Sequence, residues 1–480
     1  MVIARKIAYN VAVSSITKVL STVLALVSIG FITRYLGKEG FGNYATVLAF
    51  LSFFAAIADL GLYHISTREI SRPGANTEHI MSNIFTLRIL SSLVVFIIAP
   101  IVVLFFDYSP EVKRGIILVA GSLIFSSGYQ VLNGVFQKNL AMDKVAISEL
   151  IGKTIQVGIV IVAVKLELGF GWIVSSLLFS MIASFLIVFF LAKKFVRIKL
   201  GFDFEYWKKF LRESLPIGIG AVIVFIYFKM DTILLSVMKS GAEVGIYNAA
   251  YKVIENIIFF PAMIIGLIMP IMAGTIFANR EKFEDVSNKT FKIFVILIVP
   301  LVLGALFLAD EIIMLIGGGQ FGESAAVLKI LIFALAAVFF GVFFNNILIA
   351  GNMQKKLMFV WVSAAIINVV LNLLFIPKFS YLASAYISVA SEVTVAAMSF
   401  YLVIKKIKYY PKIEKTAGII FSGAIMAGIL YLGREVNFFV MALLSAAAYF
   451  FSLWMFKTIT TEEISSLISK KGVEEYEELP

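Results

Sequence analysis

Long runs of apolar residues recur from one end of the sequence to the other, separated by short polar or charged connections. A helix of about 20 apolar residues is long enough to cross the roughly 30 Å hydrocarbon core of a bilayer. The pattern therefore predicts about fourteen transmembrane helices. Their expected ranges are 11–33, 42–63, 82–106, 115–136, 145–165, 171–192, 214–238, 244–274, 291–309, 324–350, 357–376, 382–403, 416–433 and 437–456.

The composition agrees with an all-α polytopic membrane protein. Hydrophobic residues make up 61% of the 480 residues and charged residues only 15%, far less charge than the surface of a soluble protein of this size carries. With no cysteine and two histidines, the chain has neither disulfides nor the ligands for a thiolate or multi-histidine metal centre, so we expect no metal and no cofactor. The net charge of +11 indicates a basic cytoplasmic face against anionic lipid rather than binding to nucleic acid.

The distribution of lysine and arginine predicts the orientation and the division of the chain. Basic residues gather in alternate connections, above all in 193–213 and 405–415, which places both termini in the cytoplasm. We expect the segment "FEYWKKFLRESLP" (204–216), which begins within the basic linker 193–213, to be amphipathic and to lie on the inner surface, with Pro216 opening the next helix. The expected parts are an N-terminal lobe 1–192, the basic linker 193–213, a C-terminal lobe 214–403, two extra helices in 404–456 and a cytoplasmic tail 457–480.

Two short segments suggest an internal repeat. "GKEGFGNYATV" (37–47) and "SGAEVGIYNAA" (240–250) both place Gly-x-Tyr where a helix begins, with Gly42 and Gly245 as the equivalent glycines. An even number of predicted helices lies between them, so the two lobes should share one orientation and be related by an axis along the membrane normal.

Polar side chains follow one face of two apolar segments. Lys18 lies in a stripe of hydroxyl-bearing residues about 10 Å into the first helix, and the second stripe lies within 247–256. A lysine at such a depth either extends to the interface or lines an internal cavity, and the accompanying polar stripe favours the cavity. The candidate substrate-binding residues are Lys18, Arg34, Tyr247, Asn248, Tyr251, Lys252, Asn368 and Asn372.

Two carboxylates are candidates for ion coupling. Asp231 and Glu255 lie within apolar segments, where a buried carboxylate binds a cation or retains a proton near neutral pH. Glu255 also lies three residues after Lys252, the spacing of a helical ion pair. Asn368 and Asn372, one turn apart, either bind a ligand or join helices by hydrogen bonds.

No pattern of an enzyme is present in the sequence. A phosphate-binding glycine-rich loop is absent, no long external loop is predicted, and the early external loop "RYLGKEG" has no acidic metal-binding motif. Transport is the function class that is left.

Three separated blocks resemble the polysaccharide-transporter branch of the multidrug/oligosaccharidyl-lipid/polysaccharide exporter superfamily. They are "RYLGKEGFGNYATVLAFLSFFAAIADLGL" (34–62), "YFKMDTILLSVMKSGAEVGIYNAAYKV" (227–253) and "NVVLNLLFIPKFSYLASAYISVASEV" (368–393). The family usually has a glycine-containing turn where this chain reads "PKFSYLA" (377–383).

The resemblance implies a flippase for lipid-linked oligosaccharide or polysaccharide repeat units. It implies two six-helix lobes around a central cavity, with two helices added at the C-terminus, in the cell membrane. The partners would be a glycan on polyprenyl phosphate or pyrophosphate and membrane lipids, with a polysaccharide polymerase and glycosyltransferases as candidate protein partners. The lysines would neutralise the phosphates, and the tyrosines and asparagines would contact sugars.

Two other functions remain open. A drug or organic-cation antiporter of the same superfamily would use carboxylates, and Asp231 and Glu255 are available, although the first helix carries Lys18 and no acid. A scaffold for polysaccharide assembly without transport activity would not need aligned polar stripes.

Overall fold

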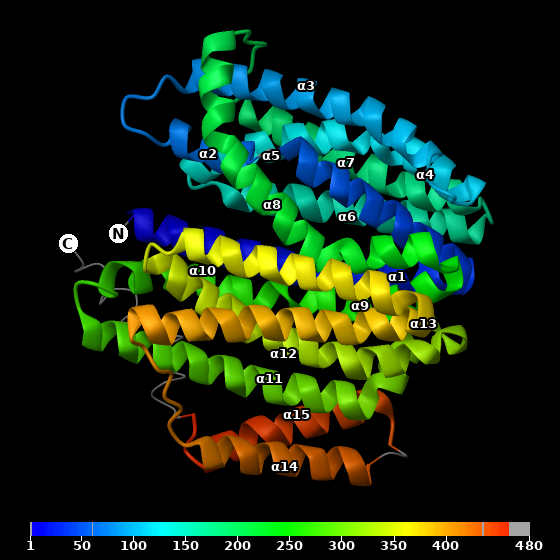
Figure 1. Cartoon of the computed structure of the whole chain (residues 1–480), viewed down its shortest axis with the longest axis vertical. Coiled ribbons are helices and arrows are strands. Elements are labelled where there is room, and N and C mark those ends of the chain that lie inside the picture. The colour runs from blue at the N-terminus through cyan, green and yellow to red at the C-terminus, as the bar shows by residue number, and fades with distance from the viewer. Residues whose placement is uncertain (1, 60, 434–435, 460–480) are drawn as a thin grey trace. The chain divides into compact units, whose positions relative to one another are not determined.

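The computed structural model describes residues 2–59, 61–433 and 436–459, and these are helical along most of their length. The predicted tail lies outside them from residue 460 onward. The helices are α1 (Val2–Asp59), α2 (Leu62–Ile70), α3 (Thr77–Leu104), α4 (Pro110–Ala120), α5 (Ser122–Lys138), α6 (Met142–Lys165), α7 (Phe170–Ala192), α8 (Phe204–Met238), α9 (Gly241–Ile257), α10 (Phe259–Thr275), α11 (Arg280–Gly317), α12 (Glu323–Ala350), α13 (Gln354–Leu402), α14 (Thr416–Leu432) and α15 (Phe438–Met455) (Figure 1).

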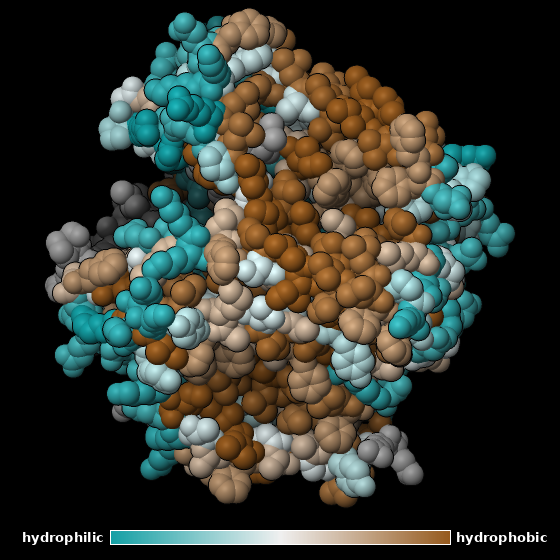
Figure 2. Space-filling view, viewed as in Figure 1, coloured by the Kyte–Doolittle hydropathy of each residue, from teal (hydrophilic) through white to brown (hydrophobic). Residues whose placement is uncertain are grey.

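The predicted all-α membrane fold is confirmed. Within the described ranges, eleven helical segments are long and apolar enough to cross a membrane, and Thr416–Leu432 is a shorter apolar helix. Two of the eleven, Ala12–Asp59 and Gln354–Ile407, each cover most or all of two predicted apolar segments. In Figure 2 apolar side chains cover the middle of the helices and hydrophilic ones gather at their ends, as the apolar core of a bilayer requires. The count of fourteen transmembrane helices stays a prediction.

Two long helices are interrupted at single residues that have a positive φ. Gly37 in α1 has φ 65° and ψ −173°, and Ser380 in α13 has φ 53° and ψ −135°. Each residue marks the boundary between two predicted spans. Ser380 lies within the segment "PKFSYLA" (377–383), and its positive φ is a conformation that glycine adopts more readily than serine. The serine hydroxyl donates a hydrogen bond to the Glu243 carboxylate, which helps to hold this turn.

The predicted start of the helix after the linker is wrong. Instead of opening at Pro216, α8 begins at Phe204 and continues through the proline. Asp203 caps the helix, because its Oδ1 accepts a hydrogen bond of 2.9 Å from the backbone N–H of Tyr206. Trp207 is buried on the early turns, so the amphipathic linker segment packs against the protein and forms the first part of the membrane helix.

The chain divides into two compact units. The first comprises Met1–Lys252, Met314–Val327 and Trp361–Ser391, and contains the whole of the predicted N-terminal lobe. Its helices α6 and α7 pack together, α6 also packs on α1, and buried side chains from α2, α3, α5, α6 and α7 form a continuous apolar core. The division into two six-helix lobes stays a prediction.

The second unit comprises Val253–Ile313, Leu328–Val360 and Glu392–Pro480. Within it α14 and α15 lie side by side (Figure 1). The fully buried Tyr449 of α15 donates a hydrogen bond of 3.0 Å to the carbonyl of Ile296 in α11. This bond and the surrounding apolar cluster attach the C-terminal helices to α11.

The two glycines of the proposed repeat meet in the first unit. A Cβ atom on Gly42 would lie 1.7 Å from the carbonyl oxygen of Gly241, and one on Gly245 would lie 2.1 Å from that of Lys38. Both distances are far below contact distance, so only glycine allows α1 and α9 to approach this closely. We call this contact the glycine seam.

Candidate functional site

Asp231 of α8 is the centre of a closed hydrogen-bond cluster. Its side chain is 2% exposed, and its Oδ1 accepts a bond of 2.8 Å from the backbone N–H of Thr232. Its Oδ2 accepts hydrogen bonds from the hydroxyls of Tyr247 and Ser388, the latter at 2.9 Å. These donors are neutral, so the carboxylate lies in an apolar helix bundle with its hydrogen bonds satisfied by groups that carry no charge.

The predicted asparagine pair lies close by on α13. Asn368 and Asn372 are both fully buried, and the Nδ2 of Asn372 donates to the Oδ1 of Asn368 at 3.1 Å. Across the turn at Ser380, Ser391 accepts a bond of 3.2 Å from Asn368, and Ser384 donates one of 3.2 Å to Asn372. The pair therefore joins the two arms of α13. A role in ligand binding stays a prediction.

The first half of the polar stripe on α9 is buried. Tyr247, Asn248 and Tyr251 are all buried, and the two tyrosine rings stack with centroids 5.7 Å apart. The Tyr251 hydroxyl donates to the carbonyl of Phe228 at 3.0 Å, and the ammonium of Lys229 lies 4.5 Å from the centre of its ring. Asn248 accepts a long bond of 3.4 Å from the Thr232 hydroxyl.

Lys252 and Glu255 lie further along α9, and both are partly buried. The structure brings the first half of the stripe into contact with Asp231 through Tyr247, and this half is closed to solvent. Lys252 therefore differs from the tyrosines before it, because part of its surface is exposed.

Lys18 of α1 faces Glu149 of α6. Its ammonium lies 3.4 Å from the Oε1 of Glu149, and the two side chains are 36% and 42% exposed. The lysine is thus paired within the bundle and retains accessible surface. Both side chains keep accessible surface, so neither charge is fully enclosed by the pair.

Arg34 bonds to main-chain carbonyls. Its Nη2 donates to the carbonyl of Leu315 at 2.6 Å and its Nη1 to that of Gly30 at 3.0 Å. Leu315 lies in the last turn of α11, where the helix dipole favours a positive charge. The neighbouring Thr33 donates to the carbonyl of Ile316 at 2.7 Å, so the end of this helix is held by two side chains of α1.

A cavity of about 430 Å³, lined by both apolar and polar side chains, opens within the first unit. It is lined by residues of α1, α4, α5, α6 and α7, among them Gln130, Glu149, Lys153 and Gln156. The sequence analysis placed none of these four residues among the candidate site residues. The signal that was missed is the spacing of 149, 153 and 156, which places all three on one face of α6.

A buried ion pair adjoins this cavity. Arg88 of α3 is 1% exposed and donates to the Asp59 carboxylate, to the Asp59 carbonyl at 2.9 Å and to the Oε1 of Gln130 at 2.6 Å. Asp59 belongs to the Asp-Leu-Gly motif of the first resembling block. Its carboxylate thus accepts a hydrogen bond from a charged group, whereas the hydrogen-bond donors described for Asp231 are neutral.

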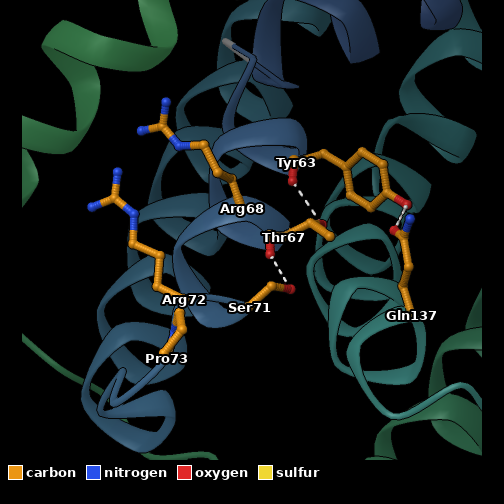
Figure 3. Close-up of a pocket in the computed structure, with 7 residues that line it drawn as sticks. All are labelled: Tyr63, Thr67, Arg68, Ser71, Arg72, Pro73 and Gln137. Carbon is orange, nitrogen blue, oxygen red and sulfur yellow. Dashed lines mark hydrogen bonds between the residues drawn. The ribbon is translucent and has the colours of Figure 1, made fainter. Parts of the chain in front are cut away.

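A second pocket, of about 570 Å³, lies along α2. It is lined by Tyr63, Thr67, Arg68, Ser71, Arg72, Pro73 and Gln137. In Figure 3 the two arginines extend to one side of α2, and Tyr63 meets Gln137 on the other. Hydrogen bonds from Arg68 to Glu213 and Glu69 raise the pKa of the arginine. Glu69 and Glu213 therefore offset the positive charge of Arg68 at this pocket. The Tyr63 hydroxyl donates to the Oε1 of Gln137 at 3.3 Å.

Comparison with known proteins identifies the family of this chain. The chain matches the polysaccharide biosynthesis protein family over residues 7–276. It is 23% identical over 442 residues to the probable low-salt glycan biosynthesis flippase Agl15 of Haloferax volcanii, a match that covers 91% of this chain and 92% of the relative.

Two solved structures share the fold. The lipid II flippase MurJ, in an inward closed conformation, matches with a TM-score of 0.75 and 17% identity over 92% of this chain and 98% of its own. An inward-facing multidrug resistance MATE family transporter of the MOP superfamily matches with a TM-score of 0.69 and 15% identity, over 83% of this chain and 98% of its own. At these identities the likeness shows the fold alone.

Proposed function

Because the chain belongs to the polysaccharide biosynthesis protein family, we propose that it is a flippase that moves lipid-linked oligosaccharide or polysaccharide repeat units across the cell membrane by alternating access. The observation that carries the proposal is the match with a glycan flippase over 91% of this chain. The multi-pass membrane fold supports it, because such a substrate has a polar head group that must pass the apolar core of the bilayer.

The phosphate of the lipid carrier would be neutralised by lysine. We assign this role to Lys18 and Lys252, since each is partly exposed within an apolar helix. The Glu149 carboxylate that now faces Lys18 is the group that a phosphate would displace. Arg34, which bonds to helix carbonyls, is proposed to hold the end of α11 next to the substrate path.

Coupling to an ion gradient is assigned to Asp231, with Glu255 as a second candidate. The hydrogen bonds described for the Asp231 carboxylate come from neutral groups, so binding of a proton or a cation would not have to break a charged hydrogen bond among them. Tyr247 and Ser388 would then position Asp231. The predicted sugar contacts would require the buried region around Asp231 to open, because the residues assigned to them are buried. These residues are Tyr247, Asn248, Tyr251, Asn368 and Asn372.

Further expectations follow from the same proposal. Both termini face the cytoplasm, and glycosyltransferases and a polysaccharide polymerase act before and after the transport step. Cysteine residues introduced one at a time into this cysteine-free chain, with accessibility to an impermeant thiol reagent as the readout, would test the orientation directly.

The function is tested in vesicles that contain the purified protein, a fluorescent lipid-linked oligosaccharide and an ion gradient. We expect the glycolipid to appear on the opposite leaflet, measured with an impermeant quencher, and a cationic dye assayed in parallel not to move. Lys252→Ala should slow the glycolipid and Lys252→Arg should preserve part of the rate, because arginine retains the charge. Dye efflux without glycolipid movement would instead identify an organic-cation antiporter.

A further inference from the structure

Two segments at the ends of membrane helices are strongly basic. The segment 193–213 has seven lysine or arginine residues and three acidic ones, and 405–415 has five lysines and one glutamate. All twelve basic residues are exposed. By contrast, the connection 166–169 at the other end of α7 has no lysine or arginine. We call 193–213 and 405–415 the basic segments.

The first basic segment is fixed to α3 by a buried asparagine. The Oδ1 of Asn83 accepts hydrogen bonds from the backbone N–H of Asp203 at 2.8 Å and from the indole N–H of Trp207 at 3.1 Å. The Thr86 hydroxyl accepts another from the backbone N–H of Gly201 at 2.9 Å. The main chain between the two groups of basic residues, in 193–199 and 208–212, is therefore held in place.

The second basic segment is fixed in the same way within the other unit, by Asn288 of α11. The Oδ1 of Asn288 accepts a hydrogen bond from the Tyr409 hydroxyl at 2.8 Å and one from the backbone N–H of Lys412 at 2.9 Å. Arg280, in the first turn of α11, donates to the carbonyl of Lys408 at 2.8 Å. In each unit one asparagine oxygen thus binds a main-chain N–H and an aromatic side chain of the basic segment.

The two asparagines also agree with the proposed repeat. They lie near the beginning of α3 and α11, which contain the third predicted helix of each lobe, and each basic segment follows the sixth predicted helix. A run of lysines that only interacts with water needs no such anchor. Its presence in both units indicates that the position of the charges matters, and not only their number.

Exposed aromatic side chains accompany the lysines. Phe202 and Phe204 are 58% and 70% exposed, and both rings contact Trp207, with centroids 6.0 Å and 5.1 Å from its own. At the second basic segment Tyr401 and Tyr410 are 57% and 63% exposed. Aromatic side chains at the ends of membrane helices are typical of the head-group level of a bilayer, where an apolar ring and a polar neighbour are both accommodated.

From these observations we propose that each basic segment is a docking site for the head groups of anionic membrane lipids. The lysine and arginine side chains would bind the lipid phosphates, and the exposed aromatic rings would lie among the head groups. The aromatic rings at the helix ends favour lipid over an acidic protein as the partner. Such binding is independent of the substrate that the protein moves.

The test compares the binding of phosphatidylglycerol and phosphatidylcholine, with identical acyl chains, to the detergent-solubilised full-length protein by native mass spectrometry. Phosphatidylglycerol should bind about tenfold more tightly, because phosphatidylcholine has no net charge.

Two triple variants locate the sites. Each replaces three basic residues of one basic segment, and the substitutions are Lys193→Gln, Lys194→Gln and Arg197→Gln in the first and Lys405→Gln, Lys406→Gln and Lys408→Gln in the second. Each variant should lose roughly half of the tightly bound phosphatidylglycerol, and all six substitutions together should remove the preference over phosphatidylcholine. The matched control changes three basic residues near the other ends of helices in the first unit, with Lys113→Gln, Arg114→Gln and Lys165→Gln, and should bind phosphatidylglycerol as the parent protein does.

A further variant separates the position of the charges from their number. Asn288→Ala keeps every lysine and removes the acceptor that holds the main chain at Lys412, so the phosphatidylglycerol affinity of the second basic segment should fall severalfold. The unfolding temperature without added lipid shows whether each variant is folded. Added phosphatidylglycerol should raise this temperature in the parent protein and raise it less in the variants.

Three results would overturn the proposal. Equal affinity for the two lipids, or phosphatidylglycerol binding unchanged in both triple variants, would leave an acidic protein as the alternative partner of these surfaces. An equal loss of phosphatidylglycerol in the control variant would show that the net charge of the protein, rather than the basic segments, attracts the lipid.

Discussion

Asp231 and Glu149 are both carboxylates within apolar helices of the first unit, but the structure holds them in opposite ways. Asp231 is closed off and bonded to hydroxyl and amide donors without charge. Glu149 is partly exposed, lines a cavity and faces a lysine. This difference is the reason that we propose Asp231, rather than Glu149, for ion coupling, and Glu149 as the partner of a lysine on the substrate path.

The largest expected effect comes from breaking the buried ion pair between Arg88 and Asp59. Arg88→Met leaves Asp59 without its buried partner, and breaking a buried pair in this way costs about 3–5 kcal/mol. We expect a large fall in the thermal unfolding temperature of the detergent-solubilised protein.

The double variant Arg88→Met/Asp59→Asn is the control for this prediction. It removes both charges and should recover much of the lost stability. If Arg88→Met is as stable as the parent protein, another group must compensate the charge of Asp59. The ion pair with Arg88 would then not be what separates the environment of Asp59 from that of Asp231.

A smaller effect is expected at Asp231. Asp231→Asn keeps the shape and removes the ionisable group, so gradient-driven glycolipid transport should fall about tenfold or more, the equivalent of about 1.4 kcal/mol, while transport without a gradient is retained. The measurement compares rates with and without a proton or sodium gradient.

Two further variants sharpen the result at Asp231. Asp310→Asn removes an aspartate that forms an exposed ion pair with Lys329 and should leave gradient dependence intact. Glu255→Gln tests the second candidate. If gradient dependence is unchanged in both Asp231→Asn and Glu255→Gln, neither carboxylate couples transport to the ion.

The smallest effect on stability is expected at Lys18. Lys18→Ala removes a half-exposed ion pair, so the free energy of unfolding should change by less than about 1 kcal/mol. Glycolipid transport should nevertheless slow severalfold, because the variant lacks a charge for the phosphate. Lys165→Ala, outside the cavity, is the control, and an unchanged transport rate in Lys18→Ala would remove that residue from the proposed site.

The sequence was sufficient to predict the helices but not the residues at which each helix begins and ends. Apolar runs of about 20 residues have one stable form in a bilayer, which is why the predicted segments fall on helices. Pro216 was interpreted as a helix start because proline lacks an N–H, but Trp207 continues the buried face before it, and tertiary packing decided the helix limit.

The candidate residues were found in part because helical spacing reveals which side chains share a face. That rule identified the stripe on α9 and the asparagine pair. It could not show that Ser388, 157 residues further along the chain, bonds to Asp231, nor that Arg88 fixes Gln130. Such contacts depend on how distant helices pack, which a single sequence does not display.

The glycine seam limits how the sequence of this protein can change. The atoms that exclude a side chain at Gly42 and Gly245 are main-chain carbonyl oxygens of Gly241 and Lys38. An obstruction by a side chain can be relieved by a smaller residue opposite, but every residue has a carbonyl oxygen. No second-site substitution in the facing helix should therefore rescue Gly42→Ala or Gly245→Ala, and suppressors of either should arise only where they move a whole helix.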